Sequence, residues 1–138
     1  MAKNTGRYKV ATDEDFEPGS NETVLKNFYG ITSRDKIEAL EGFELNRAEK
    51  ELIKTIEPDQ RFTSEDICNI HKMWLGDIYP IAGKYRSVAM SKDEFLFASP
   101  NQIDKLMRSF EKNYLSKYTP CCIQDEKEFA LVLGIVHV

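Results

Sequence analysis

The sequence has few cysteines, no long apolar run and no excess of basic residues, and each shortage excludes a class of protein. Its three cysteines, Cys68, Cys121 and Cys122, are too few for a disulfide scaffold and lack the spacing of metal ligands. No stretch approaches the roughly 20 apolar residues that span a bilayer, and the first residues lack an apolar signal core. The net charge of −4 gives no basic surface for nucleic acid or anionic lipid. We therefore expect a cytoplasmic protein that binds neither nucleic acid nor membrane, unless a signal that these patterns do not show delivers it into a host cell.

The residues that are present predict one mostly helical domain. Hydrophobic residues make up 41% of the sequence, enough for a single core. Residues 1–20 are polar and contain Pro18-Gly19, so we expect an N-terminal arm before a packed body of residues 21–138. Apolar residues at three- and four-residue steps predict helices near 21–28, 33–52, 63–75, 100–114 and 125–138. The second half of the last helix is apolar all round, which predicts a central, buried position.

Local signals refine this pattern. Thr63 and Asp66 have capping-box spacing at the start of one helix, and Pro100 can occupy the first position of another. Between these helices, a breaker-rich turn over residues 79–83 precedes two short extended runs around residues 91–94, the only hairpin candidate in the chain. The predicted fold class is therefore mostly α with one small β-hairpin.

Three consecutive segments resemble the helix, turn and flap hairpin of Fic domains in order and spacing. They read Ile70-His-Lys-Met-Trp-Leu-Gly-Asp-Ile-Tyr79, Ala82-Gly-Lys-Tyr-Arg86 and Met90-Ser-Lys-Asp-Glu-Phe-Leu-Phe-Ala98. Residues 23–31 are similar to the opening helix of bacterial members, so the resemblance covers residues 21–138. It implies a Fic-type helical bundle and the parent activity of cell-filamentation-type adenylyltransferases. That activity transfers AMP from ATP, with Mg²⁺, onto a Tyr, Thr or Ser hydroxyl of a target protein.

The family's catalytic motif does not occur in the sequence. In the family, the last apolar helix leads into a loop reading His-Pro-Phe, any residue, Asp or Glu, Gly-Asn-Gly-Arg. Its His is the general base, its acidic residue holds Mg²⁺ and its glycine-rich backbone binds phosphate. The sequence stops at Val138, about one turn before that loop, and neither of its two histidines, His71 and His137, precedes Pro-Phe. We expect an inactive chain without catalytic or metal-binding residues, and without tight binding of ATP or Mg²⁺.

Both histidines are expected to be structural. His71 lies on the apolar stripe of its helix, where a lone His is more often a satisfied core side chain than a ligand. His137 is expected inside the buried last helix, about where the family has an ordinary helical residue.

The flap is the functional surface that the resemblance implies. Arg86 and Lys84 follow the Ala-Gly turn, where they could meet nucleotide phosphates or simply be solvated charges. The flap tip would border the nucleotide and align an extended target segment by strand addition, unless it is an ordinary polar hairpin tip. The residues expected at this tip are Ser91, Lys92, Asp93, Glu94 and Phe95.

Regulation and reaction type remain open at this stage. The family's inhibitory helix has Ser or Thr four residues before a Glu that precedes Gly or Asn, whereas Glu41-Gly42 here follows Ile37. An inhibitory N-terminal helix is therefore not expected, and a small separate antitoxin is the alternative partner. The alternative functions are a Doc-like phosphotransferase toxin fragment and a non-catalytic remnant that binds a target or regulator. Outside the family, the alternative is an ordinary helical bundle.

Overall fold

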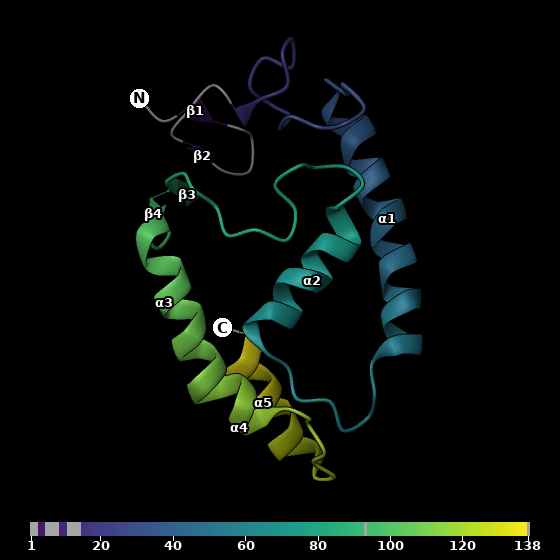
Figure 1. The fold of residues 1–138 in the computed structure, drawn as a ribbon, viewed down its shortest axis with the longest axis vertical. Helices are drawn as coiled ribbons and strands as arrows, with labels where there is room; N and C mark the ends of the chain where they lie inside the picture. Colours follow the sequence, from purple (N-terminus) through teal and green to yellow (C-terminus); the bar gives the residue numbers. More distant parts are fainter. Residues whose placement is uncertain (1–2, 5–8, 11–14, 93, 138) are drawn as a thin grey trace.

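The computed structural model describes residues 3–4, 9–10, 15–92 and 94–137. Most of the regular structure in this part of the chain is helical, as predicted (Figure 1). In chain order the elements are β1 (Lys3–Asn4), β2 (Lys9–Val10), α1 (Arg34–Thr55), α2 (Ser64–Leu75), β3 (Met90–Lys92), β4 (Phe95–Leu96), α3 (Pro100–Phe110), the π-helical turn η2 (Glu111–Leu115), α4 (Ser116–Tyr118) and α5 (Glu126–His137).

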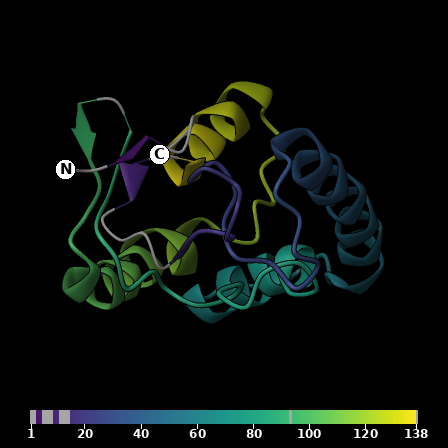
Figure 2. The same cartoon turned by 90° about the horizontal axis from the view of Figure 1, so that it is seen from above.

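Helix α2 lies between α1 and the continuous helical run made of α3, η2 and α4. It contacts α1 on one side and α3 on the other, while α5 packs against η2. Seen from above, the strands lie at the end of the molecule away from α1 (Figure 2). The strands form one antiparallel sheet in the order β1-β2-β3-β4. The predicted hairpin is thus confirmed as β3–β4, and the predicted arm of residues 1–20 contains two further strands that the sequence did not predict.

The start of α2 is fixed by the predicted capping box. The Thr63 hydroxyl accepts from the Asp66 backbone N–H at 3.1 Å, and the Asp66 carboxylate accepts from the Thr63 N–H at 2.8 Å. The Glu111 carboxylate on η2 also accepts from the Ser64 N–H, at 2.8 Å, and from the Ser64 hydroxyl, at 2.6 Å. These hydrogen bonds lower the pKa of Glu111. They also satisfy donors that a helix N-terminus otherwise leaves open, and so join η2 to α2.

The main core forms where the first loop, α1 and the end of α2 meet. Its buried members are Val24, Ile37, Ile78 and Tyr79, with partly buried apolar residues packed around them. The Phe28 backbone N–H donates to the Ile78 carbonyl at 2.9 Å, which ties the loop to the segment after α2. The Tyr79 hydroxyl donates to the Glu41 carboxylate at 2.5 Å, and burial is the main cause that raises the pKa of Tyr79. Apolar packing and this polar contact together fix the end of α2 against α1.

The helix predicted over residues 21–28 is wrong. This segment is a loop in which Asn21 and Glu22 have φ of 53° and 61°, values incompatible with a right-handed helix. The Glu17 N–H donates to the Val24 carbonyl at 2.8 Å, and the Asn27 side-chain oxygen accepts from the Ile31 N–H at 2.9 Å. Hydrogen bonds from an Asn side chain to nearby backbone, such as the one between Asn27 and Ile31, compete with helix formation. This explains why the segment is a loop and not the predicted helix.

The buried position predicted for the last helix is also wrong. Val132 is buried on α5, but Leu131 is 66% exposed and Leu133 is 49% exposed. His137 is exposed as well, against the prediction that it lies inside a buried helix. An apolar composition shows that a helix can be buried but does not supply the neighbours that would cover it. No helix in the described ranges combines the length and apolar character needed to cross a membrane.

Candidate functional site

The flap hairpin, defined here as residues 86–98, is the candidate functional site. Its strands β3 and β4 pair antiparallel, with Ser91 opposite Leu96 and Lys92 opposite Phe95. The Phe97 N–H donates to the Met90 carbonyl at 3.1 Å, which extends the pairing towards the base. The hairpin precedes α3 directly, so its base is tied to the helical body.

The structure brings four of the five predicted tip residues together on this hairpin. Ser91 is half-buried on β3, whereas Lys92 and Glu94 are exposed. Phe95, on β4, is 67% exposed. Asp93, the remaining predicted tip residue, lies outside the residues that the structure describes. The described tip therefore presents polar and aromatic side chains to solvent.

Arg86 lies at the base of the flap hairpin and joins its two legs. One terminal nitrogen of its guanidinium group donates to the Val88 carbonyl at 2.8 Å, and the other donates to the Ala98 carbonyl. Arg is suited to this because its planar group presents several donors in a fixed fork. Lys84 instead bends back, with its amine 3.4 Å from the Pro80 carbonyl. In this structure, Arg86 is thus a clamp that joins the two legs of the flap at its base.

Replacing Arg86 by alanine is expected to loosen the flap. The loss of two hydrogen bonds from a charged, partly exposed donor should cost on the order of 1 kcal/mol locally, or roughly fivefold faster amide exchange. Hydrogen exchange of the Phe97 amide, which donates to the Met90 carbonyl across the hairpin, measures this directly. Arg108→Ala is the matched control, because the Arg108 side chain pairs with Asp104 on the exposed surface of α3, away from the flap hairpin. Equal exchange rates in the Arg86 and Arg108 variants would show that the clamp does not hold the flap.

The turn before the flap depends on Gly83 and His71. Gly83 has φ of 77°, and a Cβ added there would lie 2.7 Å from the Lys72 Cβ. Its backbone N–H donates to His71 Nδ1 at 2.9 Å. His71 was predicted to be a core residue with a hydrogen-bond partner. It has the partner, but the prediction that it lies in the core is wrong, because its side chain is exposed on α2. The turn can therefore approach α2 closely only with glycine at position 83 and a hydrogen-bond acceptor at position 71.

The His71 contact predicts a pH dependence of stability. Although the His71 side chain is exposed as a whole, partial desolvation lowers its pKa, and a protonated ring could not accept at Nδ1. Because the unfolded chain then binds the proton more tightly, stability should be full above about pH 6.5 and fall as the pH drops below that value. Urea unfolding at pH 7.5 and 5.5 measures the loss. His71→Asn keeps an acceptor near the Nδ1 position without titrating, so its loss should be smaller; an identical loss would exclude this role.

Sequence reasoning missed residues that shape the flap. Leu96 is 73% exposed on β4, and Phe97 contacts Phe95 edge to face with ring centroids 5.4 Å apart. The Ala98 carbonyl completes the Arg86 clamp. The run of apolar residues after Glu94 was the sequence signal that could have pointed to Leu96 and Phe97. The carbonyl groups at positions 88 and 98 could not be predicted as acceptors, because every residue has a backbone carbonyl. The outer edge of β4 is thus more apolar than the polar tip residues alone indicated.

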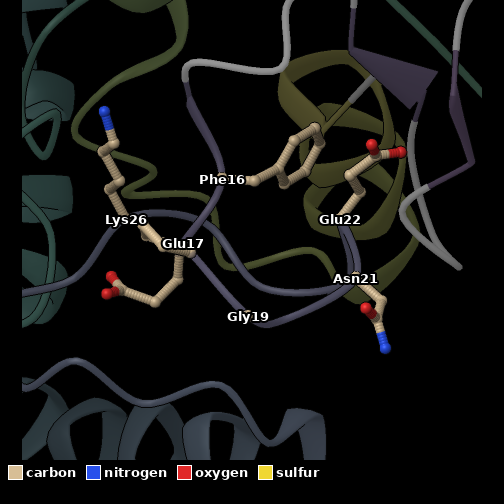
Figure 3. A pocket seen from close by; sticks show the side chains of 7 residues that line it. Phe16, Glu17, Gly19, Asn21, Glu22 and Lys26 are labelled. Carbon is tan, nitrogen blue, oxygen red and sulfur yellow. The ribbon is translucent and has the colours of Figure 1, made fainter.

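Two hollows elsewhere are poorer candidates for a catalytic site. The first, of about 420 Å³, lies on the loop of residues 16–26 (Figure 3). The side chains of Glu17, Asn21 and Lys26 diverge there, and the Glu17 carboxylate already accepts from the Asn27 N–H at 3.0 Å. The second, of about 550 Å³, is an apolar groove between α5, η2 and residues 56–62. Within the described ranges, no three His, Cys, Asp or Glu side chains are grouped as metal ligands would be.

Comparison with known proteins identifies a family and several solved structures of similar fold. The family model described as Fic/DOC family matches residues 61–138. The crystal structure of the FIC domain of Bep5, a VirB-translocated effector protein from Bartonella clarridgeiae, has a similar fold, with a TM-score of 0.60 and 20% sequence identity. The similarity covers 84% of this chain and 56% of that chain, so the chain spans a little over half of that structure. No curated protein matches the sequence.

Proposed function

The chain belongs to the Fic/DOC family, and on that premise we propose that it is the flap-bearing part of an enzyme that transfers AMP from ATP to a protein hydroxyl group. The observation that supports this most is the flap hairpin, whose base is clamped by Arg86 and whose β4 edge is unpaired by any described strand. A rigid base and an open edge are what a surface needs in order to align an extended peptide. Since ATP is abundant in the cytoplasm, we also propose that compartment as the place of action.

The flap would bind its target by strand addition at β4. Main-chain hydrogen bonds to this edge would fix the register of an extended target segment, largely independently of its sequence. Phe95 and Leu96 would contact alternate side chains of that segment, because neighbouring residues of a strand point to opposite faces. Both side chains are already exposed. The target would therefore be an extended protein segment that presents a Tyr, Thr or Ser hydroxyl at one register.

The N-terminus of α2 does not by itself fit the phosphates of ATP, and the described residues do not by themselves group ligands for Mg²⁺. A nucleotide needs free backbone donors for its phosphates, and helix N-termini commonly supply them. At α2, however, these donors are occupied by the carboxylates of Asp66 and Glu111, whose charge would repel phosphate. The described ranges also hold no group of three metal-ligating side chains. We therefore propose that ATP and Mg²⁺ bind only when a loop of the family's His-Pro-Phe type is joined to these 138 residues.

Labelled ATP tests the proposed reaction. An extended version, which continues past Val138 through the family's loop, is incubated with cell lysate, Mg²⁺ and ATP labelled on either the α- or the γ-phosphate. AMP transfer predicts labelled protein with the α-label alone. Protein labelled by γ-labelled ATP alone would instead establish the phosphotransferase, and no labelled protein with either form would leave a binding role as the function. Phe95→Ser together with Leu96→Ser should reduce labelling without unfolding the chain, because both side chains are exposed.

A further inference from the structure

The N-terminal segment pairs with the flap. Strand β2 lies antiparallel to β3, with Lys9 opposite Ser91 and Val10 opposite Met90, although about 80 residues separate the partners along the chain. Strand β1 pairs in turn with β2, which completes the sheet order β1-β2-β3-β4. Figure 1 shows these strands stacked beside the flap at the top of α3. Strand β3 is therefore paired on both sides.

This pairing changes what the flap can do. An isolated two-stranded hairpin is marginally stable in water, whereas three or more strands can persist. The flap alone has two short strands, of three and two residues, so partners on β3 should contribute much of its order. The same partners occupy the main-chain donors and acceptors along the outer edge of β3. Of the two flap strands, only β4 then has an edge to which another strand can add.

We propose that the N-terminal segment around β2 is a built-in occupant of the flap, which closes the β3 edge and directs extended partners to the β4 edge. The occupant is identified on the structure itself, since β2 is seated on β3 in a defined register. The inference rests on the proposed function only in taking the flap as the docking surface for target segments. Removal of the segment should both loosen the flap and open a second, competing edge.

Disulfide trapping tests the register. In a background with Cys68, Cys121 and Cys122 replaced by serine, the pairs Val10→Cys with Met90→Cys and Lys9→Cys with Ser91→Cys place thiols on directly opposed residues. Opposed Cβ atoms lie about 4.5–5.5 Å apart, and the closer type of pair approaches disulfide distance. Val10→Cys with Lys92→Cys is the control, since it is out of register by two residues. At least one opposed pair should form an intramolecular disulfide under mild oxidation much faster than the control.

Two outcomes of the trapping would overturn the proposal. Equal rates for opposed and out-of-register pairs would mean that β2 has no defined place on β3. Disulfide-linked dimers in place of intramolecular bonds would mean that the occupant comes from a second copy of the chain.

Hydrogen exchange tests the consequence for the flap. Deletion of residues 1–14 should speed exchange of the Ser91 amide, which faces β2, at least fivefold. The α2 amides should be unchanged, which would show that the body still folds. A synthetic peptide of residues 1–14, added to the deleted chain, should restore protection. Unchanged flap exchange after deletion would refute the proposal. Neither readout uses ATP or a target protein, so failure here is distinguishable from failure of the proposed AMP transfer.

Discussion

Replacing Ile78 by alanine is expected to lower the free energy of unfolding by about 2–5 kcal/mol, the usual range for truncating a fully buried Ile. Ile78 is 0% exposed and packs with Val24, Ile37 and Tyr79 where the first loop, α1 and α2 meet. Truncation removes apolar contacts and leaves a cavity that these neighbours can fill only in part. The total stability of a domain is roughly 5–15 kcal/mol, so this single change could remove much of it. Urea unfolding followed by circular dichroism measures the effect.

Ile53→Ala is the matched control for this prediction. It makes the same chemical change on α1, but Ile53 is 82% exposed. Substitutions at such surface positions usually change stability by no more than about 0.5 kcal/mol. If the two variants lost similar stability, Ile78 would not be in the core that the structure shows.

Features set by neighbouring residues could be predicted from the sequence. The start of α2 follows from Thr63 and Asp66, which satisfy each other's backbone donors within three residues. The flap hairpin was likewise predicted from turn residues and short extended runs, and the resemblance pointed to its tip. Where local signals conflicted, the prediction failed. The apolar spacing of residues 21–28 suggested a helix, but Asn27 bonds to nearby backbone and holds a loop instead.

Features set by distant partners could not be predicted. The pairing of Lys9 with Ser91 depends on two segments far apart in the chain, and strands of two residues carry no usable periodicity. The position of Arg86 depends on backbone carbonyls, which every residue has. The exposure of α5 depends on which elements cover it rather than on its own composition. The candidate site could therefore be predicted only as a set of residues, and that set stays a prediction, while the clamp at its base and the strand on its edge required the structure.

These 138 residues, without the family's loop, are expected to transfer no measurable AMP. The flap and helices can position reactants, but the general base, the metal ligand and the phosphate-binding backbone of the family motif do not occur in the sequence. Loss of one electrostatic donor commonly costs about 10²–10³ in rate, and a general base contributes roughly 10²–10⁴. His137 is exposed near the end of α5. A lone imidazole would still lack the groups that stabilise charge on the α-phosphate, so we do not expect it to compensate.

The claim that the chain is a Fic scaffold without catalytic power is tested most directly by labelling with α-labelled ATP. The 138-residue chain, its His137→Ala variant and the version extended through the loop are each incubated with Mg²⁺ and cell lysate. We expect labelled protein with the extended version alone, and background labelling with the other two. Protein labelled by the 138-residue chain and lost in His137→Ala would contradict the claim and identify His137 as the general base.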